Sequence, residues 1–125
     1  MTDKVISEVD DEVFVIGSGN YLKDRGYADP DEARAKFFLS NEIAVAIEKL
    51  GISQMGASER AGLKQPDISR IVNGNVKDFS VWRLMRVLSS LGRDISIEVQ
   101  NSKEDGGHIF AINRDEGTEL LALAS

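Results

Sequence analysis

The sequence contains no cysteine and a single histidine, His108. The absence of cysteine excludes disulfide scaffolds, thiol nucleophiles and zinc sites with cysteine ligands. A catalytic triad or a metal cluster built on histidine would depend on His108 alone. Most hydrolase and metalloenzyme classes therefore become poor candidates, and we expect no catalytic centre, no cofactor and no metal site.

Long apolar runs are also missing from the sequence. No segment approaches the ~18 consecutive apolar residues of a membrane-spanning helix. The chain starts with Met1-Thr2-Asp3-Lys4 and lacks a basic region followed by an apolar core, so we expect no secretory signal. A length of 125 residues, 42% hydrophobic and 29% charged, fits one globular domain in the cytoplasm without membrane contact.

The charged residues are unevenly distributed along the chain, whose net charge is −6. Residues 1–50 carry 11 acidic and 6 basic side chains, and residues 94–125 carry 7 acidic and 2 basic side chains. Between them, residues 53–93 carry three acidic and seven basic side chains, a net charge of +4. A basic segment between acidic ends can hold a polyanion locally although the whole molecule is acidic.

Caps and apolar spacing predict a long first helix over about residues 30–50. Asp29 is a suitable N-cap, Pro30 suits the first helical position and Gly51 ends the pattern. The helix has one apolar stripe with steps of three and four residues, and we allow for a break near Ser40-Asn41. The stripe consists of Leu39, Ile43, Ala46, Ile47 and Leu50.

Three shorter helices are predicted after it, over residues 54–61, 65–73 and 81–91. Ser53 caps the first and Ser80 caps the third. The apolar stripe of the third helix consists of Val81, Leu84, Met85, Leu88 and Leu91. Trp82 lies off this stripe and is either a partial core residue or an interface anchor.

Strands are predicted at both ends of the chain, over residues 12–17, 94–100 and 108–112. In the second of these, Ile95, Ile97 and Val99 alternate with polar residues, as in a strand with one solvated face. The fold class is therefore mainly α, a helix-turn-helix bundle with a short C-terminal β-strand or hairpin. We divide the chain into an N-terminal arm and short strand (1–28), a helical domain (29–93) and a C-terminal strand and tail (94–125).

The helices at 54–61 and 65–73 form a helix-turn-helix candidate with Gly62 at the turn. The small residues Ala57, Ser58 and Ala61 allow the two helices to cross closely, and Ile68, Ile71 and Val72 anchor the second helix. The opposite face of the second helix carries side chains suited to base edges in a major groove. This face consists of Gln65, Asp67, Ser69, Arg70 and Asn73.

Three further residues belong to the predicted DNA site. Lys64 and Lys77 flank the second helix and are candidate phosphate contacts. Gln54 opens the preceding helix and would face the phosphate backbone or the edge of the site. Asp67 is less favourable near phosphates, and either accepts a hydrogen bond from cytosine N4 or orients Arg70.

The segment from Ile52 to Ile71 begins with Ile-Ser-Gln and ends with Ala-Gly-Leu-Lys-Gln-Pro-Asp-Ile-Ser-Arg-Ile, and Asn73-Gly74 follows it. This pattern resembles the lambda-repressor/Cro-like (XRE) helix-turn-helix family. With Gly19-Asn20, Asp29 to Ala33, Phe79-Ser80-Val81 and Leu91 to Ile95, it is similar to the HigA-like antitoxins of toxin–antitoxin pairs. The resemblance covers about residues 17–100.

The resemblance implies a lambda-repressor-like bundle that dimerises, binds double-stranded DNA and represses its own operon, with DNA contacts at Gln54, Gln65, Ser69 and Arg70. In the antitoxin group it also implies a toxin partner. Two positions depart from the family pattern: Ser58 stands where alanine is usual, and Ala61 where a larger aliphatic residue is common. Both residues remain small enough for a close helix crossing.

A monomer with two or three base contacts, each worth ~1–3 kcal/mol, would discriminate poorly among genomic sites. We therefore expect a homodimer that reads a palindromic operator, with residues 94–100 at the dimer seam. The alternatives are a stand-alone XRE regulator and a protein-interaction module that binds a partner without DNA.

Three other motifs are weak candidates. Gly17-Ser18-Gly19 lacks the third glycine of a phosphate-binding loop, since Leu22 occupies its position. Asp10-Asp11-Glu12 is more typical of a solvated acidic arm than of a cation site. His108 is more typical of a surface or strand residue than of a ligand.

Overall fold

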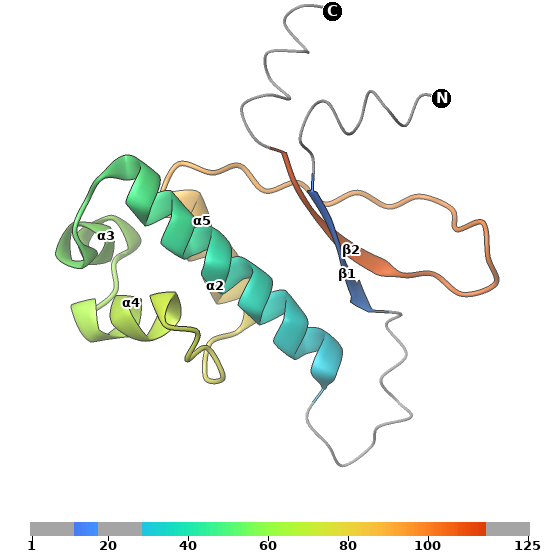
Figure 1. The fold of residues 1–125 in the computed structure, drawn as a ribbon, viewed down its shortest axis with the longest axis horizontal. Coiled ribbons are helices and arrows are strands. Elements are labelled where there is room, and N and C mark those ends of the chain that lie inside the picture. Colours follow the sequence, from blue (N-terminus) through green and yellow to red (C-terminus); the bar gives the residue numbers. More distant parts are fainter. Residues whose placement is uncertain (1–11, 18–28, 115–125) are drawn as a thin grey trace, which may run out of the picture.

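A computed structural model describes residues 12–17 and 29–114 of the chain. These residues form helices α2 (Pro30–Leu50), α3 (Gln54–Ala61), α4 (Gln65–Val72) and α5 (Val81–Ser90), and strands β1 (Glu12–Gly17) and β2 (Ile109–Asn113) (Figure 1). The architecture is mainly helical with one small sheet, as predicted. The expected acidic arm at 1–12 lies outside the described residues except for Glu12, which begins β1. The Gly17–Asn20 turn beyond Gly17 and the tail at 117–125 also lie outside them.

Helix α2 has the caps that the sequence predicts. Asp29 accepts a hydrogen bond from the Asp31 amide at 3.0 Å, and Gly51 ends the helix with a φ of 67°. The helix continues through Ser40 without the break that we allowed for, because the Ser40 hydroxyl is buried and donates to the Ile71 carbonyl oxygen at 2.6 Å.

The four helices share one apolar core. Most of the predicted stripe residues are buried in it, and Val87 joins them from α5. The prediction for Leu50 is wrong: its side chain is 41% exposed, because α2 ends there and Ile52 packs against the core after the Gly51 turn. The core consists of Leu39, Ile43, Ala46, Ile47, Ala57, Ile68, Ile71, Val76, Phe79, Leu84, Val87, Leu88 and Leu91.

Strands β1 and β2 pair antiparallel, with Glu12 opposite Asn113 and Val15 opposite Phe110. One face of this sheet packs on α2, where the Phe14 and Phe38 rings lie 5.1 Å apart and Ile16 is 5% exposed.

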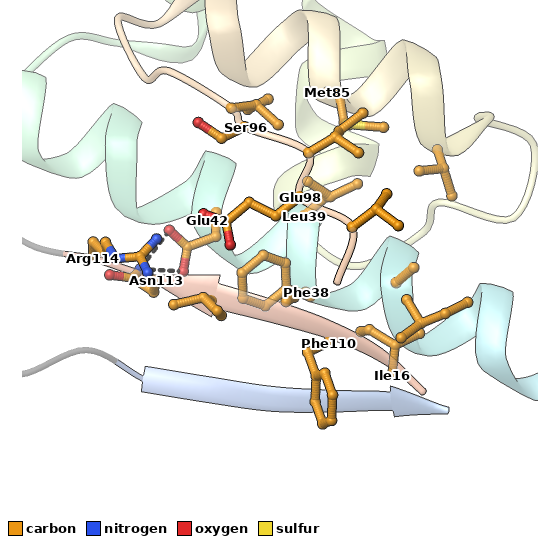
Figure 2. A pocket seen from close by; sticks show the side chains of 18 of the residues that line it. Ile16, Phe38, Leu39, Glu42, Met85, Ser96, Glu98, Phe110, Asn113 and Arg114 are labelled. Atoms are coloured by element: carbon orange, nitrogen blue, oxygen red, sulfur yellow. Dashed lines mark hydrogen bonds between the residues drawn. The ribbon is translucent and has the colours of Figure 1, made fainter. Parts of the chain in front are cut away.

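The inner face of the sheet is also joined to α2 by hydrogen bonds. The Asn113 amide donates to both carboxylate oxygens of the buried Glu42 at 2.7 Å (Figure 2). The Arg93 guanidinium, which follows α5, lies 3.9 Å from the same carboxylate. The C-terminal strand is thus linked to the middle of the long helix.

The predicted strand at 94–100 is not formed in the structure. These residues have no regular secondary structure, and Ile97 and Val99 are 76% and 93% exposed. A strand needs a hydrogen-bonded neighbour, and β2, which was expected to be its return strand, pairs with β1 instead. A cavity of about 710 Å³, lined by residues 94–102 and 107–114 together with α2 and α5, lies beside β2.

Candidate nucleic-acid interface

Helices α3 and α4 meet at a tight turn. The Ser53 hydroxyl caps α3 by accepting from the Gly56 amide at 3.0 Å. Gly62 has a φ of 70°, a left-handed conformation that a side chain would disfavour, and the Leu63 amide donates to the Ser58 carbonyl oxygen at 3.0 Å. The predicted boundaries of both helices and the role of Gly62 at the turn agree with this geometry.

The side of α3 that faces the core accommodates both departures from the family pattern. Ala57 and Ser58 are 0% and 4% exposed. The Ser58 hydroxyl donates to the Met55 carbonyl oxygen at 2.7 Å, so its burial leaves no unpaired polar atom. Ala61 is half-buried against the core. Small side chains at these positions allow the two helices to approach closely.

Helix α4 is held to the bundle along one side only. Ile68 and Ile71 are fully buried, and Val72 packs partly against the same core. The hydrogen bond from Ser40 to the Ile71 carbonyl oxygen joins the last turn of α4 to α2. These contacts leave the opposite side of α4 facing outward, at the edge of the molecule (Figure 1).

The predicted contact residues lie on this outward side or next to it. Lys64, Arg70, Asn73 and Lys77 are exposed, and Gln54, Gln65, Asp67 and Ser69 are half-buried. Lys64 stands at the N-cap position of α4 without a capping hydrogen bond from its side chain. Lys77 lies in the loop after α4, where its carbonyl oxygen accepts from the Lys36 ammonium at 3.0 Å.

Gln54 and Gln65 are brought together at the N-terminal ends of α3 and α4. The Gln65 Nε2 donates to Gln54 Oε1 at 2.8 Å. This hydrogen bond orders both amides and leaves Gln65 Oε1 and Gln54 Nε2 for an external partner. Sequence reasoning placed each glutamine in the site but did not predict this pairing, since the two residues are eleven positions apart.

Arg70 is surrounded by side chains from two segments. Its guanidinium donates to Asp67 at 3.3 Å and to Asp78 at 3.2 Å, and lies 5.2 Å from the centre of the Phe79 ring. The Arg83 guanidinium lies over the same ring at 5.0 Å. The orienting role considered for Asp67 agrees with this geometry. The sequence analysis did not place Asp78, Phe79 and Arg83 around Arg70, because their positions depend on the path of the loop before α5.

The ion pairs of Arg70 are exposed, with 44% of its side chain and 77% of the Asp78 side chain accessible. Exposed pairs of this kind contribute about 0–1 kcal/mol each. Arg70 can therefore exchange its carboxylate partners for a base or a phosphate at low cost. Asn73 is more constrained, because its Nδ2 donates to the Ser69 carbonyl oxygen at 2.9 Å and closes the end of α4.

Residues 12–17 and 29–114 contain neither a metal-ligand cluster nor a membrane-spanning helix. In this part of the chain no group of three or more His, Cys, Asp or Glu side chains is placed to hold a metal ion. No helix there has the length and apolar character needed to cross a membrane. His108 is exposed, with its ring 5.9 Å from that of Phe110.

Comparisons with known proteins agree with this geometry. A family model described as "Helix-turn-helix domain" matches residues 21–100. A solved structure described as a candidate XRE family transcriptional regulator is 31% identical to the chain, with a TM-score of 0.59. The similarity covers 62% of this chain and 88% of that one. No curated protein matches the chain.

Proposed function

Because the chain belongs to the helix-turn-helix domain family, we propose that it is a sequence-specific transcriptional repressor that inserts α4 into the major groove of its operator. The observation that carries this proposal is the one-sided attachment of α4, with Ile68 and Ile71 fully buried and Arg70 exposed. The domain resembles an XRE-family regulator. DNA binding and regulation are therefore shared by the two finer assignments, the stand-alone regulator and the antitoxin.

The proposed DNA contacts are of two kinds, base contacts on the outward face of α4 and phosphate contacts at the ends of this face. Gln65, Ser69 and Arg70 lie on the outward face of α4 and would read base edges, with the paired Gln54 supporting Gln65. Lys64 and Lys77 lie at the two ends of this face and would bind phosphates. Asp67 holds Arg70 in the free protein and would either keep that role or accept from cytosine N4. Asn73 would contribute a contact at the far end of α4.

The test is a mobility-shift titration of the full chain on a DNA fragment from upstream of its own gene, at several salt concentrations. We expect log K to fall linearly with log salt, with a slope of about 0.9 per phosphate contact. In a dimer, Lys77→Ala removes two such contacts and should reduce the slope by about 1.8. The absence of a shift at low salt would contradict DNA binding, and a salt-independent shift would contradict the phosphate contacts assigned to Lys64 and Lys77.

We also propose that the protein acts as a homodimer joined by residues 94–100. Among residues 12–17 and 29–114, 13 large hydrophobic side chains are exposed, and nine of them belong to the sheet and to this segment. Ile97 and Val99 are the two most exposed of these 13. Antiparallel pairing about Ile97 would place Ile95 opposite Val99, Asp94 opposite Gln100 and Ser96 opposite Glu98. No two acidic residues would then face each other directly.

Replacing Val99 with lysine should convert the dimer to a monomer, because two added ammonium groups would enter the apolar row of the seam. Sedimentation equilibrium measures this directly. Gln100→Lys is the matched control, since alternation points residue 100 to the other face of the strand. A monomeric wild-type chain, or a dimer unchanged by Val99→Lys, would contradict the seam.

An antitoxin role is the finer proposal for regulation. In this role the protein represses its own operon and neutralises a toxin encoded beside it. Its support is the segregation of charge: residues 1–17 and 94–125 carry 12 acidic and 3 basic side chains, whereas residues 18–93 carry 9 acidic and 12 basic side chains. A stand-alone regulator needs only the basic part. The acidic remainder fits a second, cationic partner.

A further inference from the structure

Two arginine side chains share one aromatic ring beside the proposed DNA-reading helix. The guanidinium carbon of Arg70, on α4, lies 5.2 Å from the centre of the Phe79 ring, and that of Arg83, on α5, lies 5.0 Å from it. Both distances are within the range of a cation–π interaction. Phe79 is 2% exposed and belongs to the core, so the ring holds both charges at a fixed place on the molecule.

Arg83 is brought to this ring by the helix that follows α4. It lies in the first turn of α5, where its amide donates to the Ser80 hydroxyl at 3.0 Å, and the next residue, Leu84, is fully buried. These contacts fix the backbone of Arg83, while its side chain remains exposed. The guanidinium of Arg83 is therefore a surface charge beside Arg70, although the two residues belong to different helices.

The two guanidinium groups differ in their electrostatic partners. Arg70 forms ion pairs with Asp67 and Asp78. Within the part of the chain that the structure describes, Arg83 has no ion pair, and the first turn of α5 contains no acidic residue. The helix dipole also disfavours a cation in the first turn of a helix. The charge of Arg83 is thus unfavourably placed in the free protein, and a nearby anion would stabilise it.

We infer that Arg83 binds a phosphate of the operator next to the base that Arg70 contacts. This inference rests on the proposed insertion of α4 into the major groove and adds a contact from α5. Because the two guanidinium carbons lie 5.2 and 5.0 Å from the same ring centre, they are at most 10.2 Å apart. The major groove is about 12 Å wide, so a group this close to a base contact can reach the phosphates that border the groove.

A phosphate contact differs from the base contact of Arg70 in what it contributes. Every base pair has the same backbone, so a phosphate contact adds affinity without sequence preference. Loss of Arg83 should weaken binding to the operator and to a scrambled duplex by the same factor. A purely structural role, in which Arg83 only covers the Phe79 ring, predicts a change in stability and no change in the salt dependence of binding.

The experiment measures the affinity of the full chain for the DNA fragment upstream of its own gene at about 50 and about 200 mM salt. Arg83→Met removes the charge and keeps a long unbranched side chain over the ring. In a dimer it should remove two phosphate contacts and reduce the slope of log K against log salt by about 1.8. The weakening caused by Arg83→Met should therefore be about 12-fold greater at the lower salt concentration.

Two further variants separate a phosphate contact from other effects. Arg83→Lys keeps the positive charge, so it should retain the wild-type slope. Arg86→Met is the matched control, because Arg86 is an exposed arginine one turn further along α5, and it should also leave the slope unchanged. Thermal unfolding of the three variants should stay close to that of the wild type, since neither arginine belongs to the core.

The outcomes distinguish this inference from the repressor proposal. An unchanged slope in Arg83→Met, an equal reduction in Arg86→Met, or a loss of affinity confined to the operator would overturn the phosphate contact of Arg83 and leave the repressor proposal intact. A wild-type chain that binds no DNA at low salt would overturn the repressor proposal and, with it, this inference.

Discussion

Replacing both Gln65 and Arg70 with alanine is expected to lower the affinity for the specific operator by at least about 100-fold. Each well-placed base contact contributes ~1–3 kcal/mol, and a two-fold dimer makes each contact twice. Neither side chain belongs to the core, and the ion pairs lost with Arg70 are exposed, so the fold should remain intact. Binding to random DNA should persist through Lys64 and Lys77.

Fluorescence anisotropy with an operator duplex and a scrambled duplex separates these effects. Arg86→Ala is the control, because it removes the same exposed charge from α5 without touching α4. We expect a small and equal loss on both duplexes for Arg86→Ala, and a loss confined to the operator for the double variant. A double variant that still prefers the operator would show that another element reads the sequence.

Replacing Ile68 with alanine should destabilise the protein by about 2–5 kcal/mol, the usual cost of truncating a fully buried isoleucine. Ile68 is 0% exposed and is one of the two fully buried anchors of α4. A loss of this size is a large fraction of the stability of a small domain. Urea denaturation followed by circular dichroism measures it as a lower midpoint at an unchanged slope.

The neighbouring residue provides the comparison for this prediction. Ser69 is half-buried, and its hydroxyl lies 3.5 Å from the Asn73 amide, a weak contact that alanine can lose at little cost. Ser69→Ala should therefore change the stability by no more than about 0.5 kcal/mol. Similar losses at residues 68 and 69 would mean that α4 is not attached to the bundle by one side.

The helices could be predicted from the sequence because their determinants are local. Asp29, Ser53 and Ser80 accept the capping hydrogen bonds expected of them, and Gly51 and Gly62 adopt the left-handed conformation that ends a helix. The outward face of α4 follows from the spacing of its buried residues. These features depend on neighbours within about one helical turn, which the sequence displays directly.

The sheet could be predicted only in part because its pairing is not local. The apolar residues of β1 and β2 predict two strands, but the sequence does not indicate that these strands pair with each other. It also does not indicate that residues 94–100 have no strand partner. The same limit applies within the site. Asp78 lies in the loop before α5 and forms an ion pair with Arg70. The position of Asp78 depends on the packing of its neighbours Val76 and Phe79, which are buried in the core.

The pairing of Glu12 with Asn113 has a consequence for synthesis of the chain. During translation β1 leaves the ribosome before the four helices, and β2 leaves it after them. At about 5–20 residues per second, β1 waits roughly 5–20 s before β2 is made. The helical bundle, whose contacts lie between these strands in sequence, can assemble during that interval. The sheet is therefore completed only after all four helices have been translated.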